Sequence, residues 1–338
     1  MHRIDKIYSQ PELGHFRDVL QRTGLLELLK DEELSDICIN EYGFLHLKDV
    51  RGNWQKLANS SIDSKNCTAL KNFLLHFNNK FMTADNPSEA ISLPSGERCH
   101  IIGEPVAEKG HVLFAIRKYT DVRFTLEDYD RSGRFSEIID TSPAVDFSRL
   151  NQEQKALWQY KSERDFIGFF RAAVKYRLNI AIAGSMGSGK TVFHKTLLDL
   201  VNPQLRIALI QTNKDVVMPD HPNHFHLFYA ENDRDKPSQL LKDCLRLAID
   251  IPMIAEVRGG EAWTLLEMMN IGHSGLMFTI HSNSAFKTLA RFTVCCKDNA
   301  VCLSMNEQSI FNKVKESIDL IVYMKKTRIS ELYYEPHF

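Results

Sequence analysis

The chain has 338 residues, of which 43% are hydrophobic and 25% charged, and its formal net charge is −1. These values are typical of a globular protein of about two domains, each able to bury its own core. No long run of Lys and Arg favours nucleic acid as a direct ligand. No apolar run approaches the roughly 20 residues that a membrane helix needs. We therefore expect a cytoplasmic protein that binds no nucleic acid directly.

The seven cysteines contain no CxxC pair, and most lie among apolar residues. An odd number without metal spacing predicts reduced thiols in a reducing compartment. A metal cluster at Cys295, Cys296 and Cys302 is the alternative, but no histidine or second cysteine pair completes it. We expect buried, unreactive thiols. The other cysteines are Cys38, Cys67, Cys99 and Cys244.

The first 120 residues combine helical and strand-like patterns. Apolar residues recur at helical spacing in two stretches, and short apolar runs bounded by turn residues suggest paired strands. These patterns predict a small mixed α/β domain over residues 1–120. The expected elements are helices within 12–30 and 67–81, a hairpin over 37–47 around Gly43, and strands over 90–102 and 111–119, whose apolar runs contain Arg98 and Arg117.

Residues 121–150 are polar and interrupted, with too few periodic apolar positions for a core, so we expect an inter-domain linker. From residue 151 onward, short apolar runs alternate with helical stretches. This alternation predicts a mostly parallel sheet with helices on both faces over 151–338, and ligands then collect at the carboxyl ends of the strands. The expected strands are 180–183, 206–211, 251–257, 275–281 and 318–324, and the expected helices lie in 151–176, 192–200, 237–247, 260–270, 285–292 and 307–316.

A glycine loop lies between the first of these strands and the next helix. It reads Gly184-x-x-x-x-Gly189-Lys190-Thr191. In this order backbone N–H groups can surround phosphate, Lys190 supplies a charge for the β- and γ-phosphates, and the Thr191 hydroxyl can bind Mg²⁺. A tight turn alone would not need Lys and Thr directly after its last glycine. We expect the nucleotide to be held by Gly184, Ser185, Gly187, Ser188, Gly189, Lys190 and Thr191.

Two further polar side chains end strands near this loop. Glu256 is placed to polarise a water against the γ-phosphate or to hold Mg²⁺ through water, although a surface carboxylate would occupy the same position in the sequence. His281 ends the next expected strand and can contact the γ-phosphate. A single histidine there is more often structural, so its interpretation depends on Glu256 and the glycine loop.

Several short motifs accompany the glycine loop. Those after it are Leu241–Arg246, Asp250, Ala255–Ala262, Asn270–Gly275 and Thr279–Ser284, and those before it are Leu93–Arg98 and Ala115–Lys118 in the first domain, followed by Thr125–Asp128. Their order resembles that of the type II/type IV secretion ATPase superfamily: Walker A, Asp box, Walker B and His box. The matches in the first domain, and the absence of the tetracysteine insert typical of type II assembly ATPases, favour the type IV secretion and conjugation branch.

This resemblance implies a RecA-like P-loop domain after a smaller α/β domain, and an ATPase that forms a hexameric ring. It implies ATP and Mg²⁺ as cofactors and inner-membrane components of a secretion apparatus as partners, and it is compatible with peripheral attachment to the inner membrane. The roles carried over are phosphate and Mg²⁺ binding by Lys190 and Thr191, catalysis and a metal contact by Glu256, the His-box role of His281, and arginines that reach the γ-phosphate at Arg98 or Arg117.

The chain departs from the family at Gln211 and Thr212, where the Asp box ordinarily has Glu-Asp. An amide cannot replace a carboxylate beside water or Mg²⁺, so a second hypothesis is a nucleotide-binding ring subunit that hydrolyses weakly or not at all and regulates or scaffolds the apparatus. A small-molecule kinase would share the glycine loop but would not explain the His box. Pro252 cannot donate within a sheet, so we expect it at the start of its strand.

Overall fold

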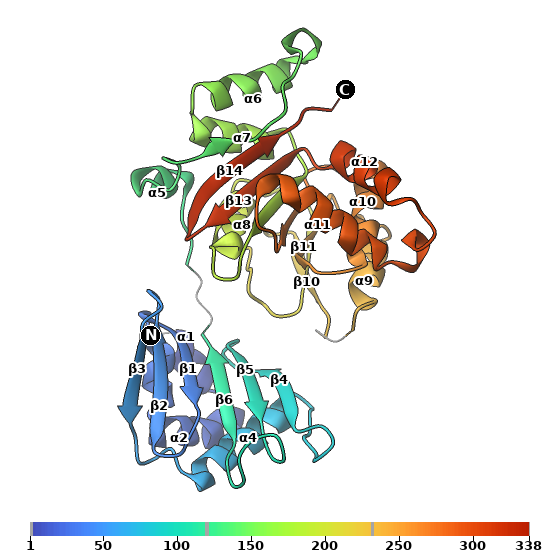
Figure 1. The fold of residues 1–338 in the computed structure, drawn as a ribbon. Helices are drawn as coiled ribbons and strands as arrows, with labels where there is room; N and C mark the ends of the chain where they lie inside the picture. The colour runs from blue at the N-terminus through green and yellow to red at the C-terminus, as the bar shows by residue number, and fades with distance from the viewer. Residues whose placement is uncertain (1–2, 119–121, 231–232, 338) are drawn as a thin grey trace. The chain divides into compact units, whose positions relative to one another are not determined.

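The computed structural model describes residues 3–118, 122–230 and 233–337. The chain divides into two compact units, Met1–Thr120 and Asp121–Phe338 (Figure 1). In the described ranges no helix is long and apolar enough to cross a membrane.

The first unit is a sheet with helices packed on one face (Figure 1). Apolar side chains of the helices and of alternate strand positions form its core, in which Phe16 stacks on Phe73 at 4.0 Å between ring centroids. Its described elements are α1 (Arg3–Tyr8), a 3₁₀ turn (Pro11–Leu13), α2 (Gly14–Arg22), α3 (Leu25–Lys30), β1 (Leu34–Ile39), β2 (Phe44–Asp49), β3 (Trp54–Ala58), α4 (Ser64–Phe77), β4 (Ser88–Ser92), β5 (Arg98–Ile102) and β6 (Leu113–Arg117).

The six described strands of this unit are all antiparallel, in the order β3-β2-β1-β6-β5-β4. The predicted hairpin around Gly43 is confirmed as β1 and β2. The single strand expected over 90–102 is wrong: it is two strands, because Gly96 adopts φ 98° in the turn that separates β4 from β5. Strand β3 escaped prediction because every one of its residues is exposed.

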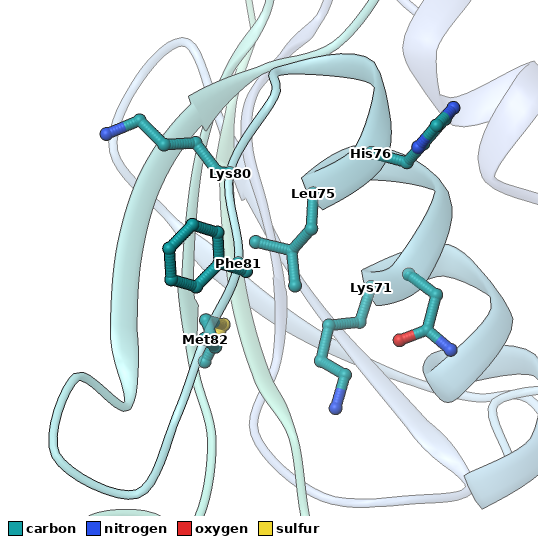
Figure 2. Close-up of a pocket in the computed structure, with 7 residues that line it drawn as sticks. Lys71, Leu75, His76, Lys80, Phe81 and Met82 are labelled. Carbon is teal, nitrogen blue, oxygen red and sulfur yellow. The ribbon is translucent and has the colours of Figure 1, made fainter.

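A shallow pocket of about 360 Å³ lies between the end of α4 and the segment that follows it (Figure 2). Leu75 and Met82 contribute apolar surface, and Lys71 and Lys80 contribute positive charge. None of the residues predicted to bind nucleotide lines this pocket.

The second unit contains the phosphate loop and a larger sheet. Its described elements are α5 (Leu126–Arg131), β7 (Ile139–Asp140), a 3₁₀ turn (Phe147–Arg149), α6 (Gln152–Ser162), α7 (Phe166–Lys175), β8 (Ile180–Gly184), α8 (Lys190–Leu198), β9 (Ile207–Gln211), β10 (His224–Phe228), α9 (Lys236–Cys244), β11 (Ile251–Val257), α10 (Glu261–Asn270), β12 (Met277–Ile280), α11 (Ala285–Lys297), a 3₁₀ turn (Ala300–Cys302), α12 (Glu307–Ser317), β13 (Leu320–Lys325) and β14 (Arg328–Tyr334).

The described strands of this sheet run in the order β10-β9-β11-β12-β8-β13-β14-β7. All neighbours are parallel except β13 and β14. Alternate residues of the central strand β8 enter different cores: Ile180 and Ile182 pack with α7 and α8, and Ala181 and Ala183 pack with α10, α11 and α12. The prediction of a mostly parallel sheet with helices on both faces is therefore confirmed.

The segment expected as a linker packs instead into the second unit. Leu126, Tyr129, Phe135 and Ile138 are all buried in the core that contains α7 and α8, and the Tyr129 and Phe193 rings meet edge to face at 5.1 Å. A capping box at Thr125 starts α5. A few large aromatic side chains supply this packing, which is why counting periodic apolar positions did not find it.

Besides the two-residue β7, which lies in the segment expected as a linker, two described strands of the larger sheet escaped prediction. Strand β10 alternates histidine with apolar residues, and none of its residues is fully buried. Strand β14 returns antiparallel to β13 through a turn in which Lys326 and Thr327 both have positive φ, a conformation that usually takes Gly or Asn. Pro252 is the second residue of β11, as expected for a residue that cannot donate to the ladder.

All seven cysteines are free thiols, and all but Cys38 are buried. Burial raises the pKa of the Cys244 and Cys295 thiols to about 11. In the part of the chain that the structure describes, no group of three or more His, Cys, Asp or Glu side chains could hold a metal ion.

Candidate nucleotide-binding and active site

The phosphate loop runs from the last residue of β8 to the first turn of α8. Gly184 has φ 154°, and a Cβ there would lie 2.4 Å from Ser188 Oγ and 2.5 Å from the Met324 carbonyl oxygen. Gly187 and Gly189 have φ of 72° and 94°. Positive φ favours glycine at these three positions, and at Gly184 a side chain would also collide with Ser188 and the Met324 carbonyl.

The first turn of α8 follows this loop directly. Its N-cap is Gly189, whose residue type offers no side chain to accept from the turn's N–H groups. Thr191 is exposed in this turn, and Ser188 is buried, with an Oγ that makes no hydrogen bond to any described residue. Uncapped N–H groups and hydroxyls at a helix N-terminus are suited to an anion.

Lys190 lies inside the loop. Its Nζ donates to the Gly184 and Ser185 carbonyl oxygens, each at 2.9 Å, and lies 3.4 Å from His281 Nδ1. Burial lowers the pKa of Lys190, and the nearby Glu256 charge opposes this shift. An ammonium with little water around it gains from an additional negative partner such as phosphate.

Glu256 and His281 meet beside the loop because β11 and β12 are neighbouring parallel strands. Glu256 lies near the end of β11, and His281 directly follows β12. Their Oε1 and Nε2 atoms are 2.9 Å apart. His281 Nδ1 lies 3.2 Å from the Gly184 carbonyl oxygen. The structure therefore brings Lys190, Glu256 and His281 into one connected cluster.

Sequence reasoning missed Arg258, which contacts the other oxygen of Glu256. Its Nε and Nη2 lie 2.9 Å and 2.8 Å from Glu256 Oε2. The signal was a basic residue two positions after the carboxylate, within the Walker B motif that had already been selected.

Arg98 and Arg117 lie in the first unit, and the cluster above lies in the second. The two arginines occupy paired positions of β5 and β6, and Arg117 also pairs with Asp36 of β1. Paired positions share a face of the sheet. This face is opposite the one covered by helices, because the neighbouring positions Cys99 and Ile116 are buried in the core.

Gln211, at which the Asp box differs from that of the family, makes hydrogen bonds that hold the local structure. It is 2% exposed, its Oε1 accepts from the Val216 backbone N–H, and its Nε2 contacts both the Val216 carbonyl oxygen and His226 Nδ1. The amide holds the loop after β9 against β10. Burial, Lys214 and His224 together lower the pKa of His226 to about 4, so its neutral ring is the partner of Gln211 at neutral pH.

A family model described as "Type II/IV secretion system protein" matches residues 150–328. The chain belongs to this family. It is 29% identical over 322 residues to the type IV secretion system protein VirB11 of Brucella suis biovar 1 (strain 1330), covering 91% of this chain and 88% of that protein. It is 28% identical over 304 residues to PtlH of Bordetella pertussis (strain Tohama I), with 88% and 87% covered.

Two solved structures are similar to this chain in fold. The VirB11 ATPase of Brucella suis in complex with sulphate is 28% identical, with a TM-score of 0.53 and 95% and 98% of the two chains covered. The Legionella pneumophila ATPase DotB, at 16% identity and a TM-score of 0.54 over 91% and 75%, is similar in fold. These matches confirm the predicted family and fold class.

Proposed function

We propose that this chain hydrolyses ATP and that the energy drives a type IV secretion or conjugation apparatus, in substrate transfer or in assembly. Family membership and full-length similarity to VirB11 support this function. The observation that carries it is the cluster in which Lys190 and His281 touch Gly184 of the phosphate loop, while His281 also contacts Glu256.

The loop residues and Lys190 would hold the phosphates of ATP. The Thr191 hydroxyl, and Glu256 through a water, offer the hard oxygen donors that Mg²⁺ prefers. Bound there, Mg²⁺ would neutralise charge on the β- and γ-phosphates. The fit rests on the exposed position of Thr191 in the first turn of α8 and on the carboxylate of Glu256 near the end of the strand two places from β8.

In hydrolysis, Lys190 would exchange its two carbonyl contacts for phosphate oxygens. Glu256 would orient the attacking water and accept its proton, and His281 would respond to the γ-phosphate through its contacts with Lys190 and Glu256. Arg117 and Arg98 stay our candidates for the guanidinium groups that offset charge on the transferred phosphoryl group.

For the assembly, we propose a homo-oligomeric ring, with a hexamer expected from the family resemblance. Its partners would be inner-membrane components of the secretion apparatus, met from the cytoplasmic side, with peripheral attachment to that membrane. Direct nucleic-acid binding is not part of this proposal.

The test is steady-state ATP turnover of the full chain beside Lys190→Ala at matched concentrations, with nucleotide binding measured in parallel. We expect turnover well above the Lys190→Ala background, about 10³-fold if the lysine contributes as charge-stabilising groups do in phosphoryl transfer. Turnover equal to the background, with ATP still bound, would overturn the motor and favour a regulatory ring subunit instead.

A further inference from the structure

The two carboxylate oxygens of Glu256 have different partners. Oε2 accepts from two nitrogens of Arg258, and Oε1 contacts His281 Nε2. Because both Arg258 donors converge on one oxygen, the other oxygen is left to His281. Charge-assisted contacts of this kind are about twice as strong as neutral hydrogen bonds, so the carboxylate is held from two sides.

His281 connects Glu256 to the phosphate loop. Its Nδ1 lies within reach of both Lys190 Nζ, at 3.4 Å, and the Gly184 carbonyl oxygen, at 3.2 Å. The Oε1 side of Glu256 therefore borders the residues that would hold the phosphates.

The backbone at Arg258 is held in place by hydrogen bonds. Glu261, which is 4% exposed, accepts from the backbone N–H of Arg258 at 2.6 Å and of Gly259 at 3.0 Å. A Cβ at Gly260 would lie 3.1 Å from the Asn299 backbone nitrogen, which leaves little room for this turn to shift. The start of α10 therefore anchors the backbone from which Arg258 reaches Glu256.

We propose that Arg258 is a positioning residue for Glu256. Its two nitrogens hold Oε2 from a backbone that Glu261 anchors, so the carboxylate keeps one orientation. Oε1 then faces the side of the phosphate loop, where His281 contacts both Glu256 and Gly184. Arg258 thereby directs Oε1 toward the water that attacks the γ-phosphate.

This inference rests on the proposed ATPase function. The experiment distinguishes a failure of the positioning role from a failure of that function. ATP turnover and nucleotide affinity are measured for the full chain, for Arg258→Gln and Arg258→Lys, and for Lys190→Ala as the blank. Arg171→Gln is the control, because Arg171 forms a surface pair with Glu127. We expect Arg258→Gln to lower kcat by about 10²-fold, the effect of misplacing a reacting group by about 1 Å.

The affinity of Arg258→Gln for ATP should stay within about 3-fold of the parent, since the contacts of Lys190 and His281 with Gly184 in the phosphate loop are unchanged by the substitution. Arg258→Lys should recover part of kcat, and added guanidinium ion should partly restore Arg258→Ala. An unchanged kcat would overturn the positioning role, as would a fall in kcat, affinity and melting temperature together. If the parent chain itself matches Lys190→Ala, the ATPase function has failed instead.

Discussion

A polar network lies at each end of strand β8. The two networks differ in whether their atoms have alternative hydrogen-bond partners. At the amino end, Asn179 uses all of its groups. Its backbone N–H donates to Asp319 Oδ2 at 2.7 Å, its side-chain amide donates to the Ser317 carbonyl oxygen at 3.0 Å, and its Oδ1 accepts from the Leu276 N–H at 3.2 Å. Each of these three groups meets a partner of the matching kind, a donor facing an acceptor.

At the carboxyl end, partners compete. Lys190 Nζ has three neighbours within 3.4 Å, and His281 Nδ1 faces one group that donates and one that accepts. A ligand can rearrange a network whose atoms have alternative hydrogen-bond partners. A network with a single set of partners stabilises the fold. We therefore expect changes at the carboxyl end to affect turnover and changes at the amino end to affect stability.

The largest expected effect tests this difference at the carboxyl end. Glu256→Gln keeps the size of the side chain but cannot accept a proton, so kcat should fall by about 10²- to 10⁴-fold while ATP still binds. The melting temperature should change little, because Glu256 is not part of a packed core. Turnover and thermal unfolding are measured beside Glu163→Gln, an exposed carboxylate at the C-terminal end of α6. Preserved turnover in Glu256→Gln would contradict the assignment.

Helix α8, which begins at the carboxyl end of β8, contains a buried histidine that should make the fold less stable in acid. His194 in α8 is fully buried, and neither ring nitrogen has a hydrogen-bond partner among the described residues. Burial first, and then the Lys195 charge, lower its pKa from 6.5 to about 4. Between these two values the unfolded chain holds more protons than the folded one, so stability should fall as the pH drops from 6.5 to 4.

The loss from His194 should approach about 3 kcal/mol below pH 4, since one pKa unit corresponds to about 1.4 kcal/mol. His194→Leu removes the titration and should flatten this part of the stability profile. Chemical denaturation across the pH range measures both chains. An equal slope in the two chains would show that other groups cause the acid sensitivity.

At the amino end of β8, Asn179→Ala should destabilise the fold by about 2 kcal/mol, because the Leu276 N–H loses its buried acceptor and the Ser317 carbonyl loses its donor. Turnover per folded molecule should be unchanged. Asn312→Ala, on the exposed surface of α12, is the control. A stable Asn179→Ala with reduced kcat would mean that the two ends of β8 are coupled and would break the comparison.

Sequence patterns predicted the second sheet well, because its central strands are continuous apolar runs ended by motif residues. Strand β8, the glycine loop and α8 lie in the order expected, and Glu256 meets His281 because parallel neighbours bring their carboxyl ends together. The exposed strand β3 and the turn at Lys326 lacked such signals. Packing by a few aromatics, as at Tyr129, carries no period at all.

Side-chain partners were the least predictable feature. A sequence gives the position of Arg258 but not the direction of its guanidinium, which depends on how the turn after β11 is anchored by Glu261. Gln211 shows the same limit. Its place in the Asp box suggested a lost acid, whereas its contacts with Val216 show an amide that uses both its donor and its acceptor.

The smallest expected effect follows from those contacts. In Gln211→Glu the carboxylate would still accept from the Val216 N–H, but its second oxygen would face the Val216 carbonyl oxygen where Nε2 now lies. This repulsion, in a side chain that is 2% exposed, should lower stability by about 1–3 kcal/mol.

Restoring the acid should therefore give no gain in turnover. Thermal unfolding and saturating-ATP turnover of Gln211→Glu are compared with Gln211→Met, which removes the same hydrogen bonds without adding charge. A higher kcat in Gln211→Glu alone would show that the carboxylate leaves its present partners for the nucleotide. The end of β9 would then belong with the rearrangeable network at the carboxyl end of β8, and not with the fixed contacts that hold the fold.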